Sequence, residues 1–172
     1  MENLRTATYA NGEPIANVTD TTWTQLSTGA WCHYDNNTAN DAIYGKLYNW
    51  YTTVDPRGLC PAGWHVPTDA EWTVLTDYLG GESVAGGKMK TITGWNAPNT
   101  SATNESGFSG LPGGFRSINT GTFYSVGLSG SWWSSSGSTA FAWYRNLGYN
   151  NGNAYRNDNN KRFGLSVRCL RD

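Results

Sequence analysis

The side chains of this chain best suited to chemistry are two histidines, His33 and His65. Histidine can act as a general base or bind a metal, because its charge changes near neutral pH. Neither histidine stands at a spacing from other ligating residues that is typical of a metal site, and His65 lies in a loop beside Trp64. The sequence also lacks a Gly-x-Ser-x-Gly elbow, a phosphate-binding loop and a His-Glu-x-x-His motif. We therefore expect structural histidines, no enzyme activity, no catalytic residues and no cofactor.

Three cysteines, Cys32, Cys60 and Cys169, form neither a zinc motif nor a redox motif, because no Cys-x-x-Cys is present. An odd number allows at most one internal disulfide. Cys60 lies in a Pro-Gly loop and Cys169 lies close to the end of the chain, so a disulfide between them would join the terminus to the body. The alternative is three reduced, buried thiols, since free cysteine packs as a small apolar residue.

Residues 142–161 are dense in Asn and Tyr and carry the strongest signal of a binding surface. Burying so many amides would leave polar groups unpaired at about 1 to 3 kcal/mol each, so most of them should face water. Antibody-like surfaces use the same composition, in which Tyr gives rigid contact area and small polar residues adapt their hydrogen bonds. We expect Tyr144, Tyr149 and Tyr155 to act as anchors. The residues that we expect to contact a ligand are Tyr144, Asn146, Gly148, Tyr149, Asn150, Asn151, Asn153, Tyr155, Asn157, Asp158, Asn159 and Asn160.

A polar, low-complexity loop without a partner is the alternative interpretation of this segment. Leu147 and Ala154 lie within it, and Trp143 and Phe163 flank its centre. Such apolar side chains can hold the segment against a core, which argues against disorder.

The overall composition excludes several kinds of partner. The net charge is -1 and the sequence pI is about 6.1, so a phosphate backbone would find no basic surface and nucleic acid is not expected. No apolar run reaches the roughly 20 residues of a membrane helix, and residues 1–9 lack the pattern of a signal peptide. We expect no direct membrane insertion.

The element pattern predicts a single α+β domain over residues 1–172, with an aromatic core supplied by 9 Trp, 10 Tyr and 5 Phe. Apolar spacing predicts a first helix over 43–51. A capping box of Thr68 and Glu71 predicts the start of a second helix, and Gly80 and Gly81 its end. Beyond residue 89 we expect loops and short antiparallel strands, at 114–118, 122–126, 130–135, 139–147 and 165–170.

Five sequence segments resemble the Fibrobacter succinogenes major paralogous domain. They are YGKLYNW at 44–50, CPAGWHVPTDAEW at 60–72, SGFSGLPGG at 106–114, WWSS at 132–135 and GLSVRC at 164–169. The resemblance spans nearly the whole chain. It implies a loop-rich C-type-lectin-like fold related to formylglycine-generating enzymes, with two helices packed on a small twisted antiparallel sheet.

A subset of that family carries the variable region of diversity-generating retroelements, in which an error-prone reverse transcriptase substitutes template adenines and Asn codons vary most. Residues 132–163 resemble such a ligand-binding region. The resemblance implies a non-catalytic, monomeric protein on a cell surface, outside the cell or on a phage particle, which binds an unknown protein or glycan. The alternative is an undiversified adhesion or carbohydrate-binding domain of the same family.

Two activities of related folds lack their residues here. Formylglycine-generating enzymes need two cysteines near the C-terminus, where this chain has only Cys169. Calcium needs six or more oxygen ligands, and the Asn- and Tyr-rich segment has one carboxylate, Asp158. We therefore expect no metal at the binding surface, while a structural ion in the loop 96–104 remains open.

Overall fold

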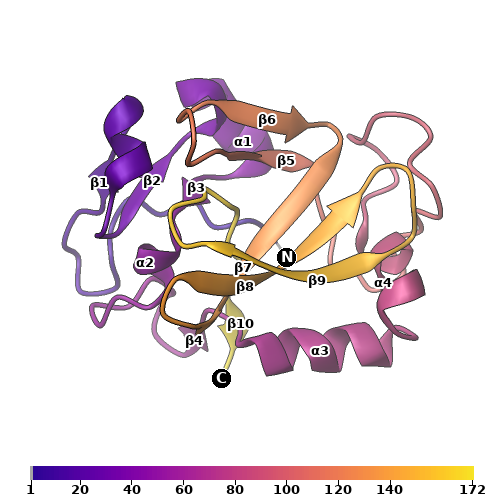
Figure 1. The fold of residues 1–172 in the computed structure, drawn as a ribbon. Helices are drawn as coiled ribbons and strands as arrows, with labels where there is room; N and C mark the ends of the chain where they lie inside the picture. Colours follow the sequence, from indigo (N-terminus) through magenta and orange to yellow (C-terminus); the bar gives the residue numbers. More distant parts are fainter. Residues whose placement is uncertain (1) are drawn as a thin grey trace.

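The computed structural model describes residues 2–172 as a mixed fold of short helices and curled β-sheets (Figure 1). Its helices are α1 (Asp41–Tyr44), α2 (Trp50–Thr53), α3 (Asp69–Tyr78) and α4 (Glu82–Met89). The prediction of mixed helix and strand is confirmed. Within residues 2–172, no helix has the length and apolar character needed to cross a membrane.

The largest sheet has five strands in the order β6, β5, β7, β8 and β9. Their bounds are Phe123–Val126 for β6, Gly113–Arg116 for β5, Ser129–Gly137 for β7, Phe141–Gly148 for β8 and Ala154–Asn160 for β9. A second sheet joins β1 (Ala16–Asn17), β2 (Ala30–Cys32) and β3 (Leu47–Tyr48), and β4 (Trp64–His65) pairs with β10 (Leu170–Arg171). Beyond residue 89 the pairs β5–β6, β7–β8 and β8–β9 are antiparallel as expected, but β5 pairs with β7 in parallel, against the prediction. Strands β1 and β2 are also parallel.

The second predicted helix is confirmed as α3. The Thr68 side chain accepts from the amide of Glu71, the Glu71 side chain accepts from the amide of Thr68, and Gly80 and Gly81 follow the helix with positive φ. Helix α4 was not predicted, because Gly86 and Gly87 weaken its helical signal. Both glycines are required by packing, since a Cβ at Gly86 would overlap the backbone of Asn153 and one at Gly87 would overlap that of Ser101.

The first predicted helix, over residues 43–51, was wrong. Gly45 has a φ of 73° and ends α1, after which Leu47 and Tyr48 pair with β2 and only then does α2 begin. Leu47 and Trp50 are buried by tertiary neighbours whereas Ile43 is exposed, so the apolar spacing imitates a helical face that the chain does not form.

Four of the late predicted strands correspond to β5, β6, β7 and β8, with shifted ends. The strand expected at 165–170 was mostly wrong, because only residues 170–171 form a strand while Leu165 and Ser166 make single bridges. Strand β9 was not predicted, since its exposed polar sequence shows no alternation of apolar residues.

Two aromatic clusters lie on opposite faces of the five-stranded sheet. Trp132 packs with Trp72, Phe108 and Met89 beneath α3 and α4, whereas its neighbour Trp133 packs on the other face with Trp50. Both tryptophans are fully buried, which confirms the aromatic core.

A disulfide joins Cys60 to Cys169, as one of the two sequence interpretations predicted. Beside it, the Leu4 amide donates to the Val167 carbonyl at 2.8 Å, so both ends of the chain contact one region. The third cysteine, Cys32, is a buried free thiol, and burial raises its pKa to about 12.

Candidate ligand-binding surface

The hairpin of β8 and β9 sorts the predicted ligand-binding residues onto two faces and a turn. Residues directly opposite each other on neighbouring strands project to the same side, and here Asn146 pairs with Tyr155 and Tyr144 pairs with Asn157. We call the side turned away from α3 and α4 the open face. Six predicted residues project to it: Tyr144, Asn146, Gly148, Tyr155, Asn157 and Asn159.

A hollow of about 270 Å³ lies on the open face. Its walls come from four strands, with Phe115 on β5, two residues each on β7 and β8, and Asn159 on β9, while Phe163 and Leu165 follow β9. The residues of β7 and β8 are Ser129, Ser131, Tyr144 and Asn146. The lining therefore combines aromatic rings with neutral hydrogen-bonding groups and contains no charged side chain.

Asn146 is the central polar residue of the hollow. Its Nδ2 donates to Ser129 Oγ at 2.6 Å and to Ser131 Oγ at 2.9 Å, both on the neighbouring strand. These bonds fix the amide plane. The Oδ1 atom accepts no hydrogen bond from any of residues 2–172 and is not buried.

Aromatic contacts hold the rings around this amide. The Tyr144 ring packs edge-on against Trp133 at 5.9 Å, and Phe115 lies 5.7 Å from Phe163. Burial raises the pKa of Tyr144, although the side-chain amides of Asn159 and Asn157 partly oppose this effect. The phenol is therefore neutral around pH 7.

The other face of the hairpin, turned toward α3 and α4, carries two predicted residues, Asp158 and Asn160, together with a network of charged side chains. Arg145 and Arg156 lie opposite each other on β8 and β9, and both bind Asp69 at the start of α3. Arg156 also stacks on the Trp143 ring at 3.6 Å. Burial alone would raise the pKa of Asp69, but hydrogen bonds from Arg156 and Arg145 outweigh it and lower the pKa.

The remaining predicted residues, Tyr149, Asn150, Asn151 and Asn153, lie in the turn between β8 and β9. Lys90 anchors this turn, because its buried Nζ donates to the carbonyls of Gly148 at 2.9 Å and Asn151 at 2.8 Å. It also donates to the Thr100 carbonyl at 2.8 Å. The Lys90 ammonium group therefore places a positive charge inside the loop 96–104. Burial lowers the pKa of Lys90 to about 8.

The side chains of residues 142–161 fall into two groups by exposure. We call the buried ones the frame and the partly or fully exposed ones the surface. None of the predicted contact residues is buried, while Ala142, Arg145, Leu147 and Ala154 between them are buried. Both flanks of the turn are regular strands, so the segment is not a loop throughout, as the alternative interpretation expected.

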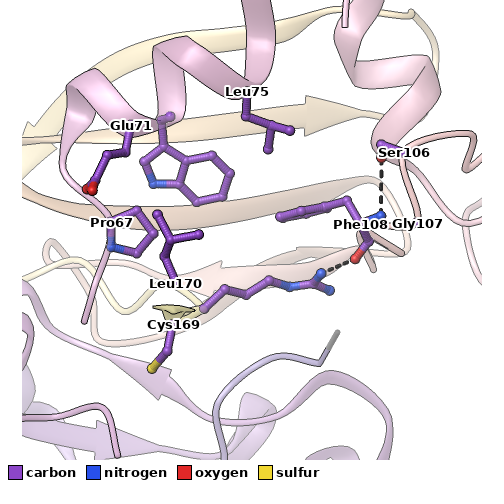
Figure 2. Close-up of a pocket in the computed structure, with 10 residues that line it drawn as sticks. Pro67, Glu71, Leu75, Ser106, Gly107, Phe108, Cys169 and Leu170 are labelled. Carbon is purple, nitrogen blue, oxygen red and sulfur yellow. Dashed lines mark hydrogen bonds between the residues drawn. The ribbon is translucent and has the colours of Figure 1, made fainter. Parts of the chain in front are cut away.

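A second, apolar pocket of about 190 Å³ lies between α3, the loop 106–108 and the C-terminal strand (Figure 2). Its polar groups already have partners. Ser106 Oγ accepts from the Phe108 amide, and the Arg168 guanidinium donates to Asn3 Oδ1 and to the carbonyls of Phe108 and Ser109. Burial lowers the pKa of Arg168 to about 9. This pocket offers apolar contact without a free polar group to orient a ligand.

His65 has a structural environment. Its Nδ1 lies 2.6 Å from Asp172 Oδ1 and its Nε2 lies 3.0 Å from Glu71 Oε1, so both ring nitrogens are engaged. His33 packs edge-on against Trp31 and lies 3.6 Å from Asp41. Among residues 2–172, no group of three or more His, Cys, Asp or Glu is arranged to hold a metal.

Sequence reasoning missed five of the eight residues that line the hollow. They are Phe115, Ser129, Ser131, Phe163 and Leu165. The alternation of Ser129, Ser131 and Trp133 along one strand is a signal for a shared face. Phe115 had no such signal, because only the parallel pairing of β5 with β7 brings it there.

Comparison with known proteins gives one match. The family model described as the Fibrobacter succinogenes major domain matches residues 1–171. No curated protein and no solved structure matches the chain.

Proposed function

This chain belongs to the Fibrobacter succinogenes major domain family, as its motifs predicted, and from that premise we propose that it is a non-catalytic ligand-binding protein. The ligand binds to the β8–β9 hairpin and the hollow of the open face. The Asn- and Tyr-rich side chains of this surface are diversified by a retroelement, and the partner is a protein or glycan of a cell surface.

One observation carries the proposal, namely the separation of frame from surface in residues 142–161. Arg145, Leu147 and Ala154 hold the hairpin to α3 and α4, while every Asn and Tyr of the segment projects at least partly into solvent. A rigid backbone with exchangeable side chains is the arrangement that a diversified surface needs, because substitutions then change recognition without disturbing packing.

The architecture and the disulfide support two finer parts of the proposal. Helices α3 and α4 against one face of a curled sheet, with both chain ends held together, support a C-type-lectin-like fold. The disulfide between Cys60 and Cys169 favours an oxidising compartment, and hence display outside the cell or on a phage particle.

The chemistry of the cysteines and histidines supports a non-enzymatic role. A formylglycine-type oxidase needs two reactive thiols, but Cys60 is bonded to Cys169 and Cys32 is buried with a raised pKa. His65, which contacts two carboxylates, lies far from the hollow in the fold, on β4 beside β10.

The decisive test is nucleotide sequence around the coding region. We expect a near-copy of the segment for residues 132–163 that differs almost only at template adenines, next to a reverse transcriptase. A locus without that copy, together with relatives that keep the same Asn and Tyr residues, would instead favour an undiversified adhesion or carbohydrate-binding domain.

A further inference from the structure

We propose that the hollow of the open face is a subsite for a single neutral sugar ring of a glycan. This inference rests on the proposed binding function and specifies the ligand class at that site. It is carried by the pairing of aromatic walls with an outward-facing amide, in a lining without charge.

The aromatic walls suit the apolar face of a pyranose ring. Phe115 and Phe163 lie against each other at 5.7 Å, and Tyr144 is fixed by its contact with Trp133. A sugar ring presents C–H groups on its faces, and burying them against rigid aromatic rings releases water at little cost in side-chain entropy.

The polar groups suit the hydroxyls at the ring's edge. Each sugar hydroxyl can donate and accept, and the lining offers both functions on three adjacent strands: Asn146 Oδ1 as acceptor, the serine hydroxyls as either, and the Asn159 amide as donor. Because Asn146 Nδ2 is bound to Ser129 and Ser131, its acceptor points in a fixed direction before the ligand arrives.

Charge and size exclude the main competitors. A sialic acid or phosphate group would be desolvated here without a cationic partner, since the lining includes no Lys or Arg. Pockets for drug-sized molecules measure roughly 300 to 1,000 Å³. The hollow of about 270 Å³ is therefore matched to one ring rather than to an extended oligosaccharide.

The experiment starts from an array of neutral and acidic glycans probed with the wild-type protein. Binding of the methyl glycoside of the best terminal sugar is then measured by calorimetry for the wild type, Asn146→Ala and the control Asp77→Ala, an exposed residue of α3 on the opposite side of the sheet. We expect a neutral glycan to bind, Asn146→Ala to weaken it about tenfold or more, and Asp77→Ala to leave it unchanged.

A second measurement does not depend on the variant's folding. Titration of the glycoside into ¹⁵N-labelled wild type should shift the side-chain amide resonances of Asn146 and leave those of Asn11, which lies outside the hollow, in place. Absence of neutral glycan binding, or an unshifted Asn146, overturns the sugar subsite.

The variant Tyr155→Ala, compared with Asn146→Ala, distinguishes an error about the sugar subsite from an error about the proposed binding surface. If Tyr155→Ala abolishes binding of a protein ligand while Asn146→Ala does not, the hairpin surface binds its partner but the hollow takes no sugar. If a ligand is bound equally by wild type, Tyr155→Ala and Asn146→Ala, both the sugar subsite and the proposed surface are wrong.

Discussion

Asp69, the first residue of α3, accepts a hydrogen bond at 2.6 Å from the guanidinium of Arg145, whose side chain is completely buried at the middle of β8. The second oxygen of the same carboxylate binds Arg156 on β9 at 2.8 Å. One carboxylate therefore fixes both strands of the β8–β9 hairpin against a helix, although 76 residues separate Asp69 from Arg145.

The first prediction concerns this ion pair. Asp69→Asn keeps the shape of the side chain but removes the charge that compensates Arg145, and loss of one partner from a buried pair is strongly destabilising. We expect the free energy of unfolding to fall by about 3 kcal/mol, measured by urea denaturation. Asp158→Asn is the control, because Asp158 is exposed and forms no ion pair with any of residues 2–172; it should change the free energy of unfolding by less than about 0.5 kcal/mol. Equal stability of the two variants would contradict a structural role for Asp69.

The second prediction concerns pH. Hydrogen bonds that the protonated His65 ring donates to the carboxylates of Asp172 and Glu71 raise its pKa above the ordinary value of 6.5. The protonated ring stabilises the fold, so this stabilisation is complete below pH 6.5 and is lost as pH rises through the higher, folded-state pKa. The effect is small because the His65 side chain is 37% exposed. Melting temperatures recorded between pH 6 and 8 should fall slightly more for the wild type than for His65→Gln; parallel curves would show that the ring contributes nothing.

The third prediction concerns the anchor of the turn. Lys90→Met removes three hydrogen bonds and leaves the carbonyls of Thr100, Gly148 and Asn151 without their donor. We expect a loss of at least about 2 kcal/mol and faster hydrogen exchange of the amide of Tyr149, which donates to Leu128 in this region. Lys88→Met is the matched control, since Lys88 is partly exposed and makes only a 3.6 Å contact with Glu105. Slow exchange at Tyr149 in Lys90→Met would show that the turn is held by other contacts.

The capping signals in the sequence predicted α3 correctly, whereas the spacing of apolar residues predicted a helix at 43–51 that does not form. The difference has a physical reason. The capping box of Thr68 and Glu71 acts within one helical turn, so neighbours along the chain suffice to determine it. At Leu47 and Tyr48 the conformation is decided by pairing with β2, which the spacing of apolar residues cannot reveal.

The proposed binding surface was predictable in composition but not in geometry. The density of Asn and Tyr indicated exposure correctly, because unpaired buried amides are costly. The division of those residues between two faces depends on the register of β8 against β9, and a shift of one residue would exchange the faces. Phe115 joins the hollow only through the tertiary pairing of β5 with β7.

The fourth prediction tests tolerance to variation, on which the proposed diversification depends. Asn157 projects into solvent from the edge strand, so a library of substitutions there should change stability by about 0.5 kcal/mol or less. Leu147 is fully buried in the cluster beneath α4, and Leu147→Asn should cost more than about 3 kcal/mol through lost packing and a buried amide. Display of both libraries with selection by protease resistance measures the contrast. Survival of nearly all residues at 157 and of only apolar ones at 147 is the expected pattern. Equal intolerance at the two positions would mean that the surface cannot vary independently of its frame, and diversification of this segment would then be ruled out.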